Sequence, residues 1–137
     1  MKGPVFIFFL LLASINLPGQ NLLNSKSEEI LKYVDKNYPE MVLEKDFKNE
    51  HYTYLKFTDD NETVTMLFFL SDESRCTSIR FIYDPDMKKI IIADLNKKYR
   101  YVGENLWYDG KSKNRASIEL KTEDWFITVS ITPIKTE

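Results

Sequence analysis

The chain has 137 residues, with 19 Lys and Arg against 21 Asp and Glu, a formal net charge of −2. This near balance argues against binding to a nucleic-acid backbone, which requires a basic surface. The single cysteine, Cys76, excludes an intramolecular disulfide. Aromatic residues make up 14% of the chain, which is typical of a strand-rich core or of a binding face.

Residues 1–20 have the layout of a secretory signal peptide. Lys2 gives a positive start, an apolar run extends from Val5 to Ala13, and small or turn-forming residues follow. The run is shorter than the about 20 residues of a membrane-spanning helix. We therefore expect a signal peptide over 1–20, one domain over 21–137, no stable membrane span, and a secreted or periplasmic location. An uncleaved anchor or a buried N-terminal helix is the alternative.

Two helices are expected from their end signals. Ser25 and Glu28 have the spacing of a capping box, in which each side chain satisfies a free amide of the other residue. Pro39 ends this first helix, since proline cannot donate a backbone hydrogen bond. The second helix opens at Asp84, which is a good N-cap, and Pro85, which suits the first helical position.

The two helices carry the same apolar pattern. ILKYVDKNY (residues 30–38) and IIADLNKKY (residues 91–99) both place apolar side chains at i, i+1, i+4 and i+8, and they lie 61 positions apart. The same spacing relates two alternating segments, VTMLFFL (64–70) and WFITVSI (125–131). A tandem duplication of a helix and three strands explains these matches.

The remaining segments predict strands and complete an α+β fold. Candidate strands cover 41–47, 51–57, 63–70 and 77–84 in the first unit and 101–108, 115–120 and 125–132 in the second. In the last strand, the core face is expected to carry Trp125, Ile127, Val129 and Ile131. We expect an antiparallel sheet of about seven strands with two helices on one face, built as a tandem α-β-β-β pseudo-repeat with units at about 25–84 and 85–134.

No local motif indicates catalysis, a cofactor or a metal site. His51 and Cys76 lack the surroundings of a catalytic pair, and they are too few for a zinc site. The segment Asp59–Glu62 offers oxygen ligands for calcium, but its residues are also those that a tight turn requires. The short basic clusters at 97–100 and 111–115 are expected on the solvent side of a helix and at a hairpin tip. We therefore expect no enzymatic activity, no cofactor and no metal.

Four aromatic residues are the candidate binding residues: Tyr52, Tyr54, Trp107 and Tyr108. Together they could form a platform for a peptide or a sugar, and core packing is the alternative. Two other functions stay open. One is a hydrolase or lyase with a carboxylate and tyrosine cleft, for which the candidate carboxylates are Glu44, Asp46, Glu104 and Glu119. The other is an apolar-ligand carrier whose cavity is lined by Phe69, Phe81, Trp107 and Phe126.

The run CTSIRFIYDPDMKKIIIADLNKKYRYVGENLWYDG, with the later segments ASIEL and DWFITVSI, resembles a pattern in small exported proteins of Bacteroidota. This resemblance covers residues 76–131. The tandem helix-plus-sheet plan is also similar to PepSY-like and β-lactamase-inhibitor-like folds, and the similarity implies a sheet face that binds a protein, without assigning any individual residue. The leading expectation is therefore an exported, non-enzymatic binding domain for a protein, a peptide or an envelope glycan.

Overall fold

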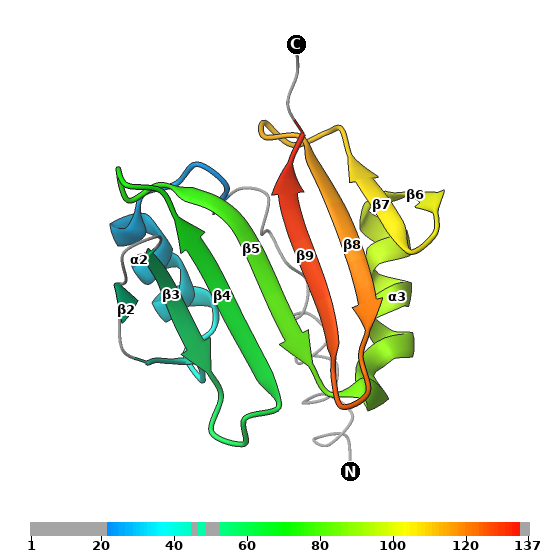
Figure 1. The fold of residues 1–137 in the computed structure, drawn as a ribbon, viewed down its shortest axis with the longest axis horizontal. Helices are drawn as coiled ribbons and strands as arrows, with labels where there is room; N and C mark the ends of the chain where they lie inside the picture. Colours follow the sequence, from blue (N-terminus) through cyan, green and yellow to red (C-terminus); the bar gives the residue numbers. More distant parts are fainter. Residues whose placement is uncertain (1–21, 45–46, 49–52, 135–137) are drawn as a thin grey trace.

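The computed structural model of the chain describes residues 22–44, 47–48 and 53–134, so the expected signal peptide lies outside the described residues. These residues form one antiparallel sheet and two helices (Figure 1). The order of strands in the sheet is β1-β3-β4-β5-β9-β8-β7-β6, and β2 pairs with β3 outside this path. The predicted α+β class with an antiparallel sheet is confirmed.

The elements follow one another as two successive groups, each of which starts with a helix. The helices are α2 (Ser27–Asn37) and α3 (Lys88–Lys98), and a 3-10 turn, η2 (Pro85–Met87), precedes α3. The strands are β1 (Val42–Leu43), β2 (Phe47–Lys48), β3 (Thr53–Thr58), β4 (Val64–Leu70), β5 (Cys76–Tyr83), β6 (Arg100–Gly103), β7 (Leu106–Asp109), β8 (Ala116–Thr122) and β9 (Ile127–Pro133). β5 joins the two groups because it pairs with β4 on one side and with β9 on the other.

The helices begin where local hydrogen bonds satisfy their free amides. The backbone N–H of Lys26 donates to Glu29 Oε1 at 2.9 Å, so the first helix starts one residue later than the predicted capping box. Before η2 and α3, Asp84 Oδ1 accepts from the backbone N–H of Asp86 at 2.9 Å. Asp84 therefore caps as predicted, but it caps the 3-10 turn that leads into α3, whose own N-cap is Met87.

One face of the sheet packs against both helices and forms the core. The buried strand residues on this face are Leu55, Phe57, Met66, Phe68, Leu70, Ile79, Phe81, Tyr83, Ala116, Ile118, Leu120, Ile127, Val129 and Ile131. The helices add Ile30, Val34, Ile91 and Leu95 to the same cluster. Phe68, for example, lies opposite Leu55 on β3 and Ile79 on β5. Figure 1 shows α2 behind the first half of the sheet and α3 behind the second half.

The segment 101–108, expected to be one strand, forms two strands joined by a tight turn. Gly103, Glu104 and Asn105 have positive φ angles of 99°, 54° and 60°. Two successive left-handed residues are typical of a type I′ hairpin turn, whose twist matches that of the flanking strands. The expected strand at 41–47 is likewise replaced by the short strands β1 and β2. The sheet therefore has nine strands, and the estimate of about seven was too low.

The last strand begins at Ile127, and not at Trp125 as the alternation suggested. The backbone N–H of Glu123 donates to the carbonyl of Phe126 at 2.9 Å and closes the β8–β9 hairpin. Trp125 lies in this turn with 86% of its surface exposed. The prediction that it belongs to the core face was wrong, because the pattern extended past the residue at which the chain reverses.

Candidate functional site

The face of the sheet that points away from α2 and α3 has no helix of the described chain over it (Figure 1). We call it the open face. Its side chains are half-buried or exposed, and from β3 to β7 they are Tyr54, Lys56, Thr65, Leu67, Phe69, Ser78, Arg80, Ile82, Thr128, Ser130, Ser117, Glu119, Lys121, Leu106 and Tyr108. The half of this face that β3, β4 and β5 form is the more apolar, while β8 and β9 contribute mainly hydroxyl and charged groups.

An aromatic patch lies on the apolar half of the open face. Tyr54 and Phe69 are directly opposite across the β3–β4 pair, with ring centroids 5.9 Å apart. The guanidinium carbon of Arg80 lies 5.7 Å from the centroid of the Phe69 ring, a cation–π distance. Leu67 is opposite Arg80 on the neighbouring strand, and Ile82 follows Arg80 along β5. These five residues are the aromatic patch.

The structure does not bring the predicted binding residues together. Tyr52 lies outside the described residues. Tyr54 is on the open face at β3, and Tyr108 is on the same face at β7, five strand spacings or about 24 Å away. Trp107 is 2% exposed and faces the helices, where its Nε1–H donates to Asn96 Oδ1 at 2.8 Å. Trp107 therefore ties β7 to α3, and a platform that includes its ring is not formed.

The four residues expected to line a carrier cavity lie on different sides of the sheet. Phe81 and Trp107 are buried under the helices, whereas Phe69 is on the open face and Phe126 is in the β8–β9 hairpin. Alternation along a strand sends neighbouring side chains to opposite faces, so Phe69 and Phe81 cannot share one cavity. The proposed carrier lining is wrong for this reason.

The candidate carboxylates of a hydrolase or lyase are also dispersed. Glu44 forms an ion pair with Lys56, with Glu44 Oε1 3.5 Å from Lys56 Nζ. Glu104 lies in the β6–β7 turn and Glu119 on the open face of β8, while Asp46 lies outside the described residues. Over the ranges 22–44, 47–48 and 53–134, no group of three or more His, Cys, Asp and Glu residues is arranged to hold a metal ion.

Cys76 is a buried thiol at the start of β5. It is 4% exposed, and its Sγ–H donates to the carbonyl of Ser78 at 3.5 Å. Burial raises its pKa to about 12, with the hydrogen bond acting in the opposite direction. A thiol that stays protonated at neutral pH is a poor nucleophile, so Cys76 packs as a small apolar residue.

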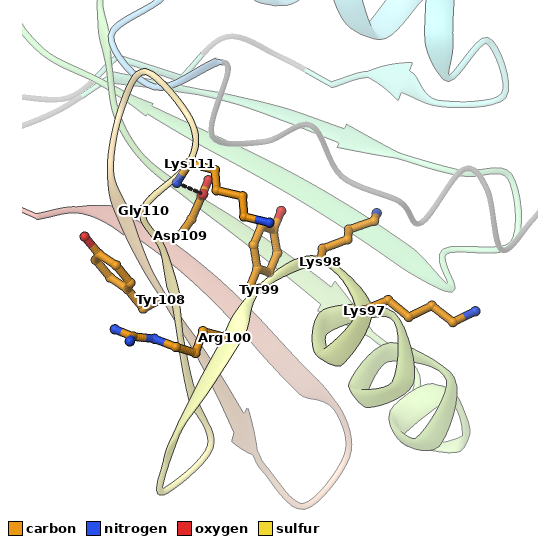
Figure 2. A pocket seen from close by; sticks show the side chains of 8 residues that line it. All are labelled: Lys97, Lys98, Tyr99, Arg100, Tyr108, Asp109, Gly110 and Lys111. Atoms are coloured by element: carbon orange, nitrogen blue, oxygen red, sulfur yellow. Dashed lines mark hydrogen bonds between the residues drawn. The ribbon is translucent and has the colours of Figure 1, made fainter.

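A cavity of about 390 Å³ lies where the C-terminal end of α3 meets the start of β6 and the end of β7 (Figure 2). Its lining residues are Lys97, Lys98, Tyr99, Arg100, Tyr108, Asp109, Gly110 and Lys111. Half of these side chains are cationic, and one is acidic. In Figure 2 the Arg100 side chain lies beside Tyr108, whereas Lys97 extends away from the strands. The basic cluster at 97–100 and the first residue of the cluster at 111–115, Lys111, thus meet at one cavity.

The Arg100 side of the cavity is held by an aromatic ring. Arg100 lies opposite Tyr108 in the β6–β7 pair, and its guanidinium carbon is 5.2 Å from the Tyr108 ring centroid. A Cβ atom on Gly110 would approach Tyr108 Cε2 to 2.6 Å, so the ring packs directly against this glycine. The absence of a side chain at Gly110 therefore sets the position of Tyr108 and, through it, of Arg100.

Two polar atoms of this lining are buried without a hydrogen-bond partner: Lys98 Nζ and Asp109 Oδ2. Lys98 Nζ nevertheless has a charged partner, because it lies 3.1 Å from Asp94 Oδ2 in an i, i+4 ion pair. Burial lowers the pKa of Lys98, and Asp94 only partly opposes this shift. Asp109 is 4% exposed, and its other oxygen, Oδ1, accepts from the backbone N–H groups of Lys111 at 3.0 Å and Ser112 at 3.2 Å.

Comparison of the chain with protein-family models, with curated proteins and with solved structures gave no match. The described part of the chain contains no helix that is both long enough and apolar enough to span a membrane. The geometry of the open face and of the cavity is therefore the basis for assigning a function.

Proposed function

We propose that the chain is an exported, non-enzymatic binding domain whose open face holds a protein partner. One observation carries this proposal. Both described helices cover the same face of a nine-stranded sheet, and the other face keeps apolar and charged side chains in contact with solvent. The apolar side chains of this face are half-buried, and apolar side chains gathered on one surface and partly open to solvent are a mark of interaction sites.

The size of the open face favours a folded protein as the partner. The six strands from β3 to β7 span about 29 Å at about 4.8 Å per strand, and seven residues span about 23 Å. The resulting area of roughly 670 Å² is close to the about 800 Å² per partner of a standard protein–protein interface. A single sugar ring or a short peptide would cover only a small part of it.

The chemistry of the aromatic patch indicates what the partner presents. Arginine and aromatic residues are enriched among the residues that dominate binding energies. Arg80 is exposed, makes no ion pair within the described residues, and is held over the Phe69 ring. A partner with an apolar surface beside a carboxylate would bury Phe69 and pair with Arg80. The hydroxyl groups of Ser117, Thr128 and Ser130 then form a polar rim.

The proposal is tested by charge reversal on the open face. The full chain is used to isolate partners from an envelope extract, and each partner is then purified and its affinity measured by calorimetry. Arg80→Glu is expected to weaken binding at least about tenfold, because it removes a charge-assisted contact and adds repulsion. Lys89→Glu on the exposed side of α3 is the matched control and should bind like the unmodified chain. A partner that binds Arg80→Glu at full affinity, or a partner that is a glycan or a short peptide, would refute the proposal.

The proposal that the chain is exported depends on residues 1–20, and it is tested by a separate experiment. A full-length chain with a C-terminal tag should appear in the envelope or medium as a product that lacks about 20 N-terminal residues, the usual length of a signal peptide. An intact mass that includes Met1 in the mature protein would contradict export through a cleaved signal.

We also propose that the domain is a tandem pseudo-repeat related to the small exported proteins with PepSY-like architecture. Buried positions recur 61 residues apart, which supports the duplication. The pairs are Ile30 and Ile91, Val34 and Leu95, Leu55 and Ala116, Phe57 and Ile118, Met66 and Ile127, Phe68 and Val129, and Leu70 and Ile131. Positions 61 residues after β5 lie outside the described residues. In a crystal structure, superposition of α2 and β4 on α3 and β9 should bring the two residues of each pair to the same place. A best superposition that matches other residue pairs would contradict the spacing of 61 residues.

A further inference from the structure

One row of side chains crosses the open face from β4 to β7. Each residue of the row is the direct cross-strand neighbour of the next, in the order Leu67, Arg80, Ser130, Glu119 and Leu106. The row is symmetric about Ser130 on the middle strand, β9, because it has a leucine at each end and one charge on either side. The two charges have opposite signs. A second copy of the row, turned end for end, would therefore place each charge against its opposite.

Arg80 and Glu119 do not pair with each other within one copy. Their strands lie two spacings, about 10 Å, apart in the sheet. Both side chains are exposed, and neither forms an ion pair with another described residue. The guanidinium group of Arg80 is held over the Phe69 ring. Each of the two charges is therefore open to an opposite charge on a partner.

The adjacent row of the open face has the same symmetry. Phe69 lies opposite Ser78, and Tyr108 lies opposite Ser117. Thr132 of β9 lies between the two serines. This row therefore has an aromatic ring at each end and hydroxyl groups in the middle, and it too matches itself when it is turned end for end.

This symmetry fits a face-to-face dimer with a two-fold axis along β9, midway between the two sheets. A two-fold axis brings the same surface of both copies together. Here it places β5 of one copy over β8 of the other, and β4 over β7. Two twisted sheets usually pack in this aligned way, about 10 Å apart, in β-sandwiches. The residues that face each other across the interface are Arg80 and Glu119, Leu67 and Leu106, and Phe69 and Tyr108.

We propose that the partner of the open face is a second copy of this chain. This inference rests on the proposed function, since it names the partner of the same surface. The chain itself presents an apolar side chain beside a carboxylate, because Leu106 lies opposite Glu119 in the β7–β8 pair. Roughly 670 Å² from each copy gives a total of about 1,300 Å², within the range of about 1,200 to 2,000 Å² for stable interfaces.

The apolar and the charged pairs have different roles in this dimer. The leucine and aromatic pairs supply the apolar area that favours association. The pairing of Arg80 with Glu119 fixes the register, because a shifted arrangement would leave charges buried without a partner. A third row places Ile82 of one copy over Lys121 of the other. The apolar stem of the lysine can cover the isoleucine while its ammonium group stays in water.

Exchange of the two charges tests the proposal. Arg80→Glu puts a carboxylate at both facing positions of the dimer, and Glu119→Arg puts a guanidinium at both. Each variant alone should dimerise at least about tenfold more weakly than the unmodified chain, because like charges then meet. An equimolar mixture of the two variants should form a one-to-one heterodimer, since every facing pair is then of opposite charge. The double variant with both changes should dimerise like the unmodified chain.

Analytical ultracentrifugation of the purified full chain measures the dimerisation, and native mass spectrometry identifies the heterodimer in the mixture. The unmodified chain should dimerise with a Kd of about 10 µM or tighter, as interfaces of this size do. Lys89→Glu, on the exposed side of α3, is the control and should leave the Kd unchanged. Circular dichroism verifies that each variant is folded.

Three results would overturn the proposal: an unmodified chain that stays monomeric at about 1 mM, a dimer that persists in both single variants, or a mixture of the folded variants that stays monomeric. None of them decides the proposed function. A different protein isolated from the extract that loses affinity for Arg80→Glu would uphold the open face as a binding surface while the homodimer fails. A chain with neither a second copy nor another protein on this face would refute both.

Discussion

The two tryptophans provide the sharpest test of the fold, since the structure exchanges the roles that the sequence suggests for them. Trp107, a candidate for an exposed platform, is 2% exposed and donates a hydrogen bond to Asn96. Trp125, expected in the core, is 86% exposed in the β8–β9 turn. Trp107→Ala should therefore destabilise the protein strongly, whereas Trp125→Ser should leave its stability almost unchanged.

The expected difference is large enough to measure without ambiguity. Truncation of a buried tryptophan to alanine lowers the free energy of unfolding by about 3 to 5 kcal/mol. For a domain of about 110 residues, the entropy of unfolding near 60 °C is about 0.23 kcal/mol/K, so Trp107→Ala should lower Tm by about 13 to 22 °C. A surface substitution such as Trp125→Ser changes the free energy by at most about 0.5 kcal/mol, or about 2 °C.

Thermal and urea unfolding, followed by far-UV circular dichroism, measure both changes. Trp107→Phe serves as a milder variant, because it keeps an aromatic ring but loses the hydrogen bond to Asn96, and it should fall between the other two. Acrylamide should quench the fluorescence of Trp125 in the Trp107→Phe protein far more than that of Trp107 in Trp125→Ser. A Trp125→Ser protein as unstable as Trp107→Ala would refute the described β8–β9 turn.

Three further predictions concern titration, reactivity and capping. Burial raises the pKa of Tyr83 and Tyr38 above the ordinary value of 10, so the folded state keeps protons that the unfolded state loses. The stability that these two protonated tyrosines contribute is complete below pH 10, and above it the free energy of unfolding should fall by about 1.4 kcal/mol per pH unit for each group. Tyr83→Phe should reduce this dependence of unfolding free energy on pH, measured by urea unfolding between about pH 10 and 11. An unchanged dependence would contradict the argument. Cys76 should react with a thiol reagent at pH 8 only as fast as the protein unfolds, and rapid labelling of the native protein would show that the thiol is accessible. Asp84→Ala should lower the free energy of unfolding by about 1 kcal/mol, because the capping hydrogen bond is lost. Asp84→Asn should retain most of the capping stabilisation. Equal destabilisation by both variants would indicate that the charge of Asp84 matters more than its hydrogen bond.

Features that depend on a few neighbouring residues could be predicted from the sequence. The alternation in β4 and in Ile127–Pro133 of β9 gives the correct buried face, because a one-residue slip would bring every apolar side chain into water. The cap at Asp84 is also local, since it needs only a short acceptor followed by Pro85.

Features that depend on a chain reversal or on a distant strand could not be predicted. Glu104 adopts a positive φ of 54°, which its residue type does not suggest, and so the β6–β7 turn was missed. With that turn in place, pairing of Trp107 with Ile118 of β8 directs the indole ring to the helix side. Aromatic content alone could not distinguish Trp107 from Tyr108, because adjacent residues of a strand always face opposite sides.

The cavity was missed for a different reason. Lys98 ends a helix and Asp109 ends a strand, and each has a sufficient local explanation: a cation at the helix C-terminus and a carboxylate that accepts from the following turn. The Asp-Gly dipeptide after β7 was the one available signal, and it indicates a turn more directly than a site. Only the packing of α3 on β7 brings the ammonium and the carboxylate into one lining.

The open face and the cavity are not equally informative about function. Half-buried residues such as Phe69 are tolerated on any protein surface, so exposure alone is weak evidence. The Lys98 ammonium, by contrast, is buried beside one carboxylate, Asp94, at 3.1 Å, and this ion pair offsets the cost of desolvation only in part; local costs of this kind are expected at functional sites. Lys98→Met should accordingly be no less stable than the unmodified chain at pH 7, since folding already disfavours the charged form and the remaining Asp94 is partly exposed to solvent. Retained stability of Lys98→Met in urea unfolding would show that the ion pair contributes little to the fold, whereas a strongly destabilised Lys98→Met would show that its ion pair with Asp94 serves the fold.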